Sequence, residues 1–415
     1  MTSPKVQKCP VLIVGGGPVG LVLACLLALN DVEVVVLERR TRPRQYSRAI
    51  GLHPPALAVL HEIGVDTAAL AEGTRVHAGT AYSRGRRIGS LSFEQAWPAR
   101  PFVLTLPQNR TEAILRHRLE HLAPGALQTG WEVTKIADRS GVHVTTRSTA
   151  EPSGTGPPPE VRWQADLLIG ADGPHSLVRK TAGIGTRTRA LKDTYVMGDF
   201  AQHAGRNAIA DDSDETTAAI FLEPAGVVES FPLPDKMRRW VAHTGTELVP
   251  ESAHLLSDLI SERTGARVDP TTATMVSAFH VRRRIAQRMV ADRCVLIGDA
   301  AHEVSPIGGQ GMTLGWLDAL ELAPLLSNAL AAHHPAPLHQ QADFQAFEHT
   351  RLAAARATAR QAELNMALGR SMPISSAVIR DAALKTVLGT RMRHRLARAF
   401  TMRQPLGGAE IHLPR

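Results

Sequence analysis

A glycine-rich turn between an apolar strand and an apolar helix constrains this chain more than any other feature. Val11 to Val14 is a short, continuously apolar run that ends at Gly15-Gly16-Gly17-Pro18-Val19-Gly20. Val19 to Leu29 has the composition of a helix, and Val32 to Leu37 is a second run of β-branched residues. Continuously apolar strands are typical of parallel sheets buried on both faces. The sequence therefore predicts a βαβ unit and an α/β fold.

The spacing of the glycines indicates a site for bound phosphate. Gly15, Gly17 and Gly20 fit the pattern G-x-G-x-x-G, which allows a tight turn, close approach of backbone to a pyrophosphate and close helix packing. The helix N-terminus then directs unpaired amides toward the phosphates. Glu38 ends the second strand, where its carboxylate can accept from ribose hydroxyls. These residues predict dinucleotide binding; the alternative is a turn that serves packing alone.

A second glycine-rich segment favours a flavin over a nicotinamide as the dinucleotide. Val295 to Ile297 is an apolar strand leading into Gly298-Asp299, and Pro306 to Met312 precedes a helix expected from about Thr313. A carboxylate at the end of a central strand can hold a ribityl hydroxyl. A glycine-rich helix entry presents backbone amides to an electron-rich ring, which suits a reduced flavin whose pyrimidine edge becomes anionic.

Helical and strand-like stretches alternate along the rest of the chain. A helix is expected after Pro54-Pro55, another from Arg110 to Leu122, and a helical region from Trp316 to the end. Strands are expected at 131–136, 142–146, 161–170, 218–222, 227–231 and 239–243, the last three as an antiparallel sheet. Two segments are expected to be exposed, a hairpin tip at 148–159 and an acidic loop at 211–215.

Composition excludes several classes of protein. The 415 residues are 44% hydrophobic, which supports a sizeable core. The net charge is +8, but the basic side chains are mostly scattered and aromatics make up only 4%, so nucleic-acid binding is not expected. Three cysteines form no disulfide framework and have no metal-ligand spacing, so a cytoplasmic protein without a metal site is expected. The glycines at 15–17 interrupt the N-terminal apolar stretch, which argues against a signal peptide or membrane span.

Three segments together carry a resemblance to a known family. The N-terminal fingerprint, ADGPHSLVR (171–179) and GDAAHEVSPIGGQGMTLGWLDA (298–319) resemble the signatures of the single-component FAD-dependent aromatic hydroxylases, the para-hydroxybenzoate hydroxylase family. SRAIGLHPPALAVL (47–60) and LPQNRTE (106–112) resemble its polyketide-tailoring branch. The resemblance covers residues 10 to 330, and the order of the three signatures is highly specific.

The resemblance implies a fold and a division into domains. The expected fold is a Rossmann-like FAD-binding domain, a βαβ unit plus a β-meander, with an inserted, mainly antiparallel substrate sheet and a C-terminal helical segment. The FAD-binding domain would comprise 1–75, 100–185 and 281–330. The substrate domain would comprise 76–99 and 186–280, and the C-terminal helices 331–415. Within these, the basic helix Arg391 to Phe400 is expected to dock on the FAD-binding domain with its arginines solvated, rather than on a membrane.

By similarity, fifteen residues would bind the cofactor: Gly15, Gly17, Pro18, Val19, Gly20, Glu38, Arg39, Arg48, Gln108, Asp172, Asp299, Pro306, Gly309, Gly311 and Met312. Arg48 would lie along the pyrophosphate, and Asp172 belongs to the signature that serves both FAD and the reduced nicotinamide. Each has a plainer alternative, since Arg48 could be a surface arginine, Gln108 a helix cap and Asp172-Gly173 an ordinary turn. His302 is expected to be a packed, hydrogen-bonded histidine. Thr313 departs from the family, which usually has Asn there.

The implied activity is that of an FAD-dependent monooxygenase in secondary metabolism, such as antibiotic biosynthesis. NAD(P)H would reduce FAD, and O2 would give a flavin 4a-hydroperoxide that oxygenates, most simply hydroxylates, an aromatic or polycyclic molecule. The substrate would lie against the 195–280 sheet, which offers Met197, Phe221, Phe231 and Trp240 as ligand contacts or as core. No catalytic base is assigned. The protein would be a monomer or homodimer.

Two other readings stay open at this point. A flavin-dependent oxidase or reductase on the same scaffold would not accumulate the oxygen adduct. A non-catalytic flavin-binding protein would show no NAD(P)H oxidation.

Overall fold

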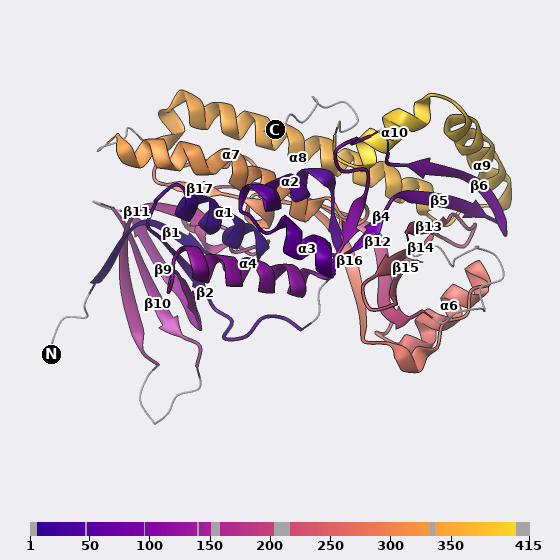
Figure 1. The fold of residues 1–415 in the computed structure, drawn as a ribbon, viewed down its shortest axis with the longest axis horizontal. Coiled ribbons are helices and arrows are strands. Elements are labelled where there is room, and N and C mark those ends of the chain that lie inside the picture. The colour runs from indigo at the N-terminus through magenta and orange to yellow at the C-terminus, as the bar shows by residue number, and fades with distance from the viewer. Residues whose placement is uncertain are drawn as a thin grey trace.

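The computed structural model describes residues 6–45, 48–94, 96–138, 141–150, 158–202, 216–332 and 337–403. Within these ranges the chain forms two large β-sheets, a small third sheet and helices that cover them (Figure 1). The predicted mixed α/β fold class is therefore confirmed. Among the described helices, none combines the length and the apolar character that a membrane crossing would need.

The first sheet is built around the apolar strand that precedes the glycine-rich turn. β1 (Val6–Val14) pairs in parallel with β2 (Val34–Glu38) on one side and β11 (Glu160–Gly170) on the other. Its apolar side chains are buried because strands flank it on both edges and helices cover the sheet. The sheet order is β8-β2-β1-β11-β10-β9 with β17 beside β11, the further strands being β8 (Leu127–Thr129), β9 (Trp131–Asp138), β10 (Val142–Ser148) and β17 (Cys294–Leu296).

Helices confirm the predicted βαβ unit and surround its helix. α1 (Pro18–Leu29) follows the glycine turn and packs against α4 (Gln108–Leu122) and α7 (Gly311–Ala331). It is apolar on nearly all sides because it lies inside the molecule. α7 begins at Gly311, slightly before the expected start at Thr313. The remaining helices near this sheet are α2 (Pro54–Glu62), α3 (Asp66–Glu72) and α5 (Leu177–Thr181).

The second sheet has the order β18-β16-β12-β15-β14-β13-β5-β6 and is antiparallel except between β13 and β5. The antiparallel sheet expected between residues 195 and 280 is thus confirmed, and a hairpin from residues 78–92 extends it. Its strands are β5 (Ala78–Ser83), β6 (Arg86–Ser92), β12 (Thr186–Ala201), β13 (Thr217–Phe221), β14 (Val228–Leu233), β15 (Met237–Gly245), β16 (Met275–Ala286) and β18 (His302–Glu303). The third sheet contains β3 (Gly51–Leu52), β7 (Val103–Thr105) and β4 (Thr74–Val76).

Two predicted exposed segments fall wholly or partly outside the described residues. β10 and β11 pair antiparallel, as a hairpin across 148–159 requires, but 151–157 are not described. The acidic segment 211–215 is not described either.

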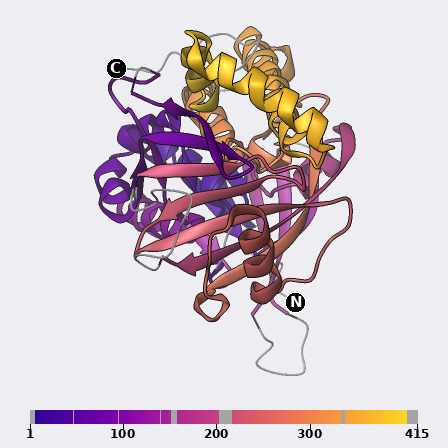
Figure 2. The same cartoon turned by 90° about the vertical axis from the view of Figure 1, so that its right-hand side faces the viewer.

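The two faces of the second sheet have different neighbours. α6 (Ala253–Thr264) packs on one face, where Phe200, Phe221 and Trp240 form a core with its apolar side chains. The opposite face carries Tyr195 and Met197, because successive residues of a strand point to opposite sides. The C-terminal helices, shown in orange to yellow in Figure 2, lie over one side of this sheet. They are α8 (Ala342–Gly369), α9 (Ile374–Gly389) and α10 (Met392–Phe400).

The basic helix α10 does not dock mainly where the sequence analysis placed it. It packs against α9 and against β6 of the second sheet, and the Phe400 ring stacks on Phe93 with centroids 5.4 Å apart. Its Arg391, Arg393 and Arg395 are exposed to solvent, as expected. Its C-terminal end also contacts the part expected to bind FAD: Phe400 meets the His53 ring edge-on, and Nε2 of Gln310 donates to the carbonyl oxygens of Ala399 and Phe400 at 3.3 and 3.1 Å.

Candidate functional site

One cavity of about 980 Å³ is lined by residues of both large sheets and of the C-terminal helices. This volume lies at the upper end of the roughly 300–1,000 Å³ usual for small-molecule sites. At one end lie the glycine turn and the strand ends of the first sheet. At the other end lies the apolar face of the second sheet. All fifteen residues predicted to bind a cofactor line this cavity except Gly20.

The glycine turn packs closely against neighbouring backbone at Gly15 and Gly20 and is open at Gly17. A Cβ on Gly15, whose φ is +111°, would collide with the carbonyl oxygen of Ala171, and one on Gly20 would collide with that of Gly15. A Cβ on Gly17 would meet no atom within 4 Å. Gly17 caps α1 without any side-chain cap, and Pro18 occupies the first turn. The N-terminus of α1 therefore opens into the cavity and offers amides and a positive dipole end to an anion.

Glu38 is oriented by its own neighbourhood. Its Oε2 accepts a hydrogen bond from the backbone N of Gly16 at 2.9 Å, and its Oε1 accepts from Nε of Arg40 at 2.8 Å. Burial opposes ionisation of this carboxyl, but the hydrogen bonds from Arg40 and Gly16 leave its pKa below the ordinary value. Glu38 thus presents a fixed carboxylate to the cavity. The sequence analysis named Arg39, which also lines the cavity, but missed Arg40 as the partner of Glu38.

Asp172 has one carboxylate oxygen engaged and one free. Its Oδ2 accepts from the backbone N of Leu177 at 2.7 Å and of Val178 at 3.2 Å, at the start of α5. Its Oδ1 is buried and has no hydrogen-bond partner among the described residues. Burial raises the pKa of this carboxyl, although a hydrogen bond from the Ser176 side chain and the backbone hydrogen bonds oppose the shift. Asp172 therefore holds the first turn of α5 through one carboxylate oxygen, and its contact with a cofactor stays a prediction.

Asp299 follows β17 in a short 3-10 turn, η2 (Gly298–Ala300). Its side chain is exposed, but to the cavity that it lines. Enclosure by the protein raises its pKa to about 6. Water in the cavity opposes that shift, because the side chain is exposed to it.

A buried network supports the Asp299 turn from behind. Asp318 of α7 accepts from the backbone N of Gly298 at 3.0 Å, contacts Nε2 of His302 at 2.6 Å and accepts from Nε of Arg351 at 2.7 Å. Burial opposes ionisation of Asp318, but His302 and Arg351 hold its pKa below the ordinary value. The expectation that His302 is a packed, hydrogen-bonded histidine is confirmed, since it is 1% exposed.

The second glycine-rich segment forms a loop that enters α7. Gly308 and Gly309 have φ of +94° and +65°, a conformation that glycine adopts readily. Nε2 of His53 lies 3.0 Å from the carbonyl oxygen of Gly308. Thr313 does not line the cavity: it is fully buried, and its hydroxyl has no partner in the described structure. Contact of its side chain with a ring in the cavity, which the sequence left in doubt, is therefore not supported.

Two other predicted residues adopt specific contacts on the cavity wall. The Arg48 guanidinium donates from Nε to Oγ of Ser277 at 3.2 Å and lies 5.2 Å from the centre of the Phe279 ring, on β16. Gln108 opens α4 and donates from Nε2 to Glu112 at 2.8 Å. In this conformation both side chains are held by protein groups, so contact with a cofactor remains a prediction for each.

The face of the second sheet settles which aromatic residues meet the cavity. Met197 and Phe231 line it, whereas Phe221 and Trp240 pack on the opposite face beneath α6. Tyr195 also lines the cavity, and its hydroxyl has no partner in the described structure. The alternation of the strands predicted two faces, but the sequence could not tell which face turned inward.

Arg239 is a cavity residue that the sequence analysis missed. Its guanidinium pairs with both carboxylate oxygens of Asp199, at 2.6 and 2.7 Å. It also donates to the backbone carbonyl of Arg48 at 2.6 Å and so joins β15 to the segment that precedes β3. The residue lies within the apolar run 239–243, which was the available signal.

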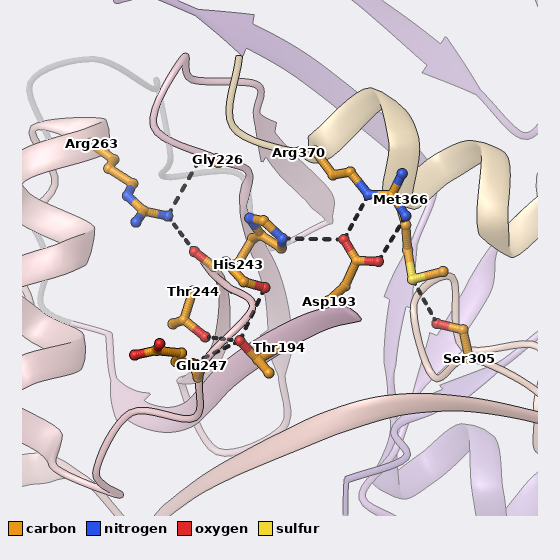
Figure 3. Close-up of polar contacts among 11 residues, drawn as sticks. Asp193, Thr194, Gly226, His243, Thr244, Glu247, Arg263, Ser305, Met366 and Arg370 are labelled. Atoms are coloured by element: carbon orange, nitrogen blue, oxygen red, sulfur yellow. Dashed lines mark hydrogen bonds and ion pairs between the residues drawn. The ribbon is translucent and has the colours of Figure 1, made fainter. Parts of the chain in front are cut away.

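A polar cluster fastens the end of α8 to the second sheet (Figure 3). Asp193 of β12 accepts two hydrogen bonds from the Arg370 guanidinium, both at 2.8 Å, and lies 3.3 Å from Nε2 of His243. Residues of α8, among them Gln361, Asn365 and Leu368, line the cavity just before this attachment. His243 itself does not line the cavity and His280 is exposed, so the structure brings neither to the site as a base.

The sequence of this chain is similar to those of known proteins. The family model described as "FAD binding domain" matches residues 8–362. The chain is 33% identical over 80% of its length to 6-methylpretetramide 4-monooxygenase of Streptomyces rimosus and covers 58% of that protein. It is 30% identical over 78% of its length to 6-hydroxy-3-succinoylpyridine 3-monooxygenase HspB of Pseudomonas putida and covers 80% of that protein.

A solved structure shows the same fold across almost the entire chain. The structure of p-nitrophenol 4-monooxygenase PnpA from Pseudomonas putida superposes with a TM-score of 0.83 at 20% identity, covering 98% of this chain and all of that one. By contrast, the chain spans between 58% and 65% of the length of three Streptomyces rimosus relatives, a 6-methylpretetramide 4-monooxygenase and two anhydrotetracycline monooxygenases.

Proposed function

The chain belongs to the FAD binding domain family, and we propose that it is an FAD-dependent NAD(P)H:oxygen monooxygenase. Its reaction inserts one atom of O2 into an aromatic or polycyclic small molecule, by hydroxylation. One observation carries the proposal: a single cavity joins an anion-binding glycine turn to a broad apolar sheet face. The names of its relatives, which act on tetracycline intermediates, rifampicin and nitrophenol, support a place in secondary metabolism.

Two features of the cavity fit FAD. Gly17 leaves an open cradle at the N-terminus of α1, where a pyrophosphate would gain from the helix dipole. Asp172 keeps a buried carboxylate oxygen without a partner, as expected of a group that serves a ligand hydroxyl or amide. When bound there, FAD would supply the redox chemistry, accepting a hydride from NAD(P)H and activating O2.

The residues of this chain would bind the cofactor, orient its ring and shield the reacting atoms from water. Glu38 would accept from the adenosine ribose and Asp299 from the ribityl chain. The backbone amides of Gly309 and Gly311 would orient the ring edge at the entry of α7. The apolar face of the second sheet, roofed by α8, would keep water from the reacting atoms. No residue is assigned as a proton-transfer catalyst.

The proposal also covers the domains, the binding of the nicotinamide, the compartment and the oligomeric state. Residues 1–75, 100–185 and 281–330 would form the FAD-binding domain, 76–99 and 186–280 the substrate domain, and 331–415 the C-terminal helices. The sequence holds one G-x-G-x-x-G pattern, so the nicotinamide would bind transiently. The protein would act in the cytoplasm as a monomer or homodimer.

The test is oxygen transfer itself. The full chain is loaded with FAD and supplied with NADPH, ¹⁸O2 and a panel of phenols, naphthols and hydroxyanthraquinones, and products are analysed by mass spectrometry. We expect one labelled oxygen atom in the product of at least one compound. NADPH oxidation that yields only hydrogen peroxide across the panel would favour the oxidase or reductase, and absence of NADPH oxidation a non-catalytic protein. A protein that takes up no FAD would overturn the whole proposal.

A further inference from the structure

The register of the second sheet places one carboxylate in the middle of an apolar surface. Met197 of β12 pairs with Val241 of β15, which pairs with Glu229 of β14. Glu229 pairs in turn with Ile220 of β13, and Ile220 with Ala81 of β5. These cross-strand partners form a continuous row, and every member lines the cavity. Glu229 is therefore the polar member of a row whose other side chains are apolar.

Glu229 differs from two other carboxylates of the cavity, Glu38 and Asp172. Glu38 and Asp172 each accept hydrogen bonds from backbone amides. In the described part of the chain, no hydrogen bond or ion pair reaches the half-buried carboxylate of Glu229. The guanidinium of Arg239, in the adjacent row, is already paired with Asp199. Burial alone acts on Glu229 and raises its pKa to about 7.

The lack of a protein partner matters once a ligand enters. An apolar ligand filling the row would strip water from the carboxylate and leave it uncompensated, which opposes binding. A ligand that presents a hydroxyl would replace that water with a charge-assisted hydrogen bond. An anionic ligand would meet like-charge repulsion. Glu229 thus discriminates among ligands of similar shape by what they place over the centre of the sheet.

We propose that Glu229 is a specificity-determining residue, which accepts a hydrogen bond from a ring hydroxyl of the substrate and rejects ethers and carboxylates at that position. The inference rests on the proposed function, because the ligand concerned is its substrate. It deepens that function by stating which substituent the substrate must carry toward the second sheet.

Three matched probes test the inference: 2-naphthol, 2-methoxynaphthalene and 2-naphthoate. Their affinities for the FAD-loaded full chain are measured by isothermal titration calorimetry at pH 8. For the natural sequence we expect 2-naphthol to bind about tenfold or more tighter than either other probe, as one hydrogen bond to a charged group allows. In Glu229→Gln the preference should fall to about threefold or less, because an amide can also donate to an ether or carboxylate oxygen.

A second variant, Glu229→Leu, distinguishes a role in specificity from a purely structural role. Glu229→Leu should bind 2-methoxynaphthalene more tightly than the natural protein does, because no charge is then desolvated. Ile220→Val, one strand away in the same row, serves as the control: it should change the three affinities by similar factors and leave their ratio intact. Failure of the natural protein to bind 2-naphthol, or the same preference in both Glu229 variants, would overturn the inference. Failure of the proposed function would show separately, as absence of FAD uptake or of labelled product.

Discussion

Nε2 of His53 donates a hydrogen bond of 3.0 Å to the carbonyl oxygen of Gly308, a residue 255 positions later in the chain. The acceptor requires the proton on Nε2, and burial of the ring lowers the pKa of His53 to about 4. The neutral imidazole therefore braces the glycine loop that leads into α7. Phe400 packs edge-on against the same ring, with centroids 5.8 Å apart. The loop that would orient a cofactor ring is thus held by segments from both ends of the chain.

Lowering the pH should destabilise the folded protein at this contact, because the pKa of His53 is lower in the folded protein than in the unfolded chain. The unfolded chain binds a proton to His53 near pH 6.5, whereas the folded protein resists it until about pH 4. Stability from neutral His53 is present above pH 6.5 and is lost as the pH falls toward 4. Between pH 7.5 and 5 this amounts to about 2 kcal/mol.

His53→Gln should remove that part of the pH dependence while keeping a donor to Gly308. Urea unfolding at pH 7.5 and 5 measures it, with the exposed His280→Gln as control. Equal pH dependence in His53→Gln and the natural protein would contradict the assignment.

Two glycines of the first turn should respond in opposite ways. Gly15→Ala forces a Cβ into the Ala171 carbonyl at a positive φ, so we expect a loss of about 2 kcal/mol or more in unfolding free energy. Gly17→Ser adds a side chain only to open space and supplies a favourable helix cap, so stability should be kept. FAD affinity of Gly17→Ser should nevertheless fall about tenfold or more, because the hydroxymethyl group occupies the cradle. Thermal unfolding and FAD titration together check the pair; unchanged FAD affinity would argue against pyrophosphate at Gly17.

Asp299→Asn separates binding from stability. No protein group partners this carboxylate in the described structure, so the unfolding free energy without FAD should change by less than about 0.5 kcal/mol. Affinity for FAD should drop, because an amide is a weaker acceptor for the ribityl hydroxyl. Flavin fluorescence titration measures the effect. Natural affinity in this variant would remove Asp299 from the cofactor site.

Asp318→Asn should do the reverse and mainly destabilise the fold. Its carboxylate is fully buried among His302, Arg351 and the amide of Gly298, so removing the charge should cost about 3 kcal/mol. Because the folded pKa of Asp318 is lowered, its contribution is present above the ordinary Asp pKa and is lost as the pH falls through the folded value. The variant should therefore show a shallower acid limb in a plot of stability against pH. A natural melting temperature would contradict this role.

The parts of the fold that the sequence predicted are those with local signals. β1, α1 and β2 follow from one apolar run, one glycine turn and one further apolar run, and Asp299 follows from β17 for the same reason. The resemblance to a family then connected segments that lie far apart in the sequence. Placement of these residues around one cavity agrees with that connection, while their contacts with a cofactor stay predictions.

The parts that the sequence did not predict depend on distant partners. Glu229 is one of two polar residues in the run 227–231, and its apolar surroundings arise only because Val241 and Ile220 flank it in register. His53 gains its role from Gly308, and Arg239 from Asp199 and Arg48. The inward face of the second sheet was undecided because both faces are apolar, one against α6 and one against the cavity.

During synthesis, β1 emerges from the ribosome long before β11, the strand with which it pairs. β1 can find β2 almost at once, but Val11 pairs with Leu167, which is 156 positions later. At a ribosomal rate of about 5–20 residues per second, one edge of this apolar strand waits roughly 8–30 s for its partner. An unpaired apolar edge is a template for intermolecular pairing. A chaperone that covers residues 6–14 should therefore raise the yield of folded protein, whereas slower translation, which lengthens the wait, should lower it.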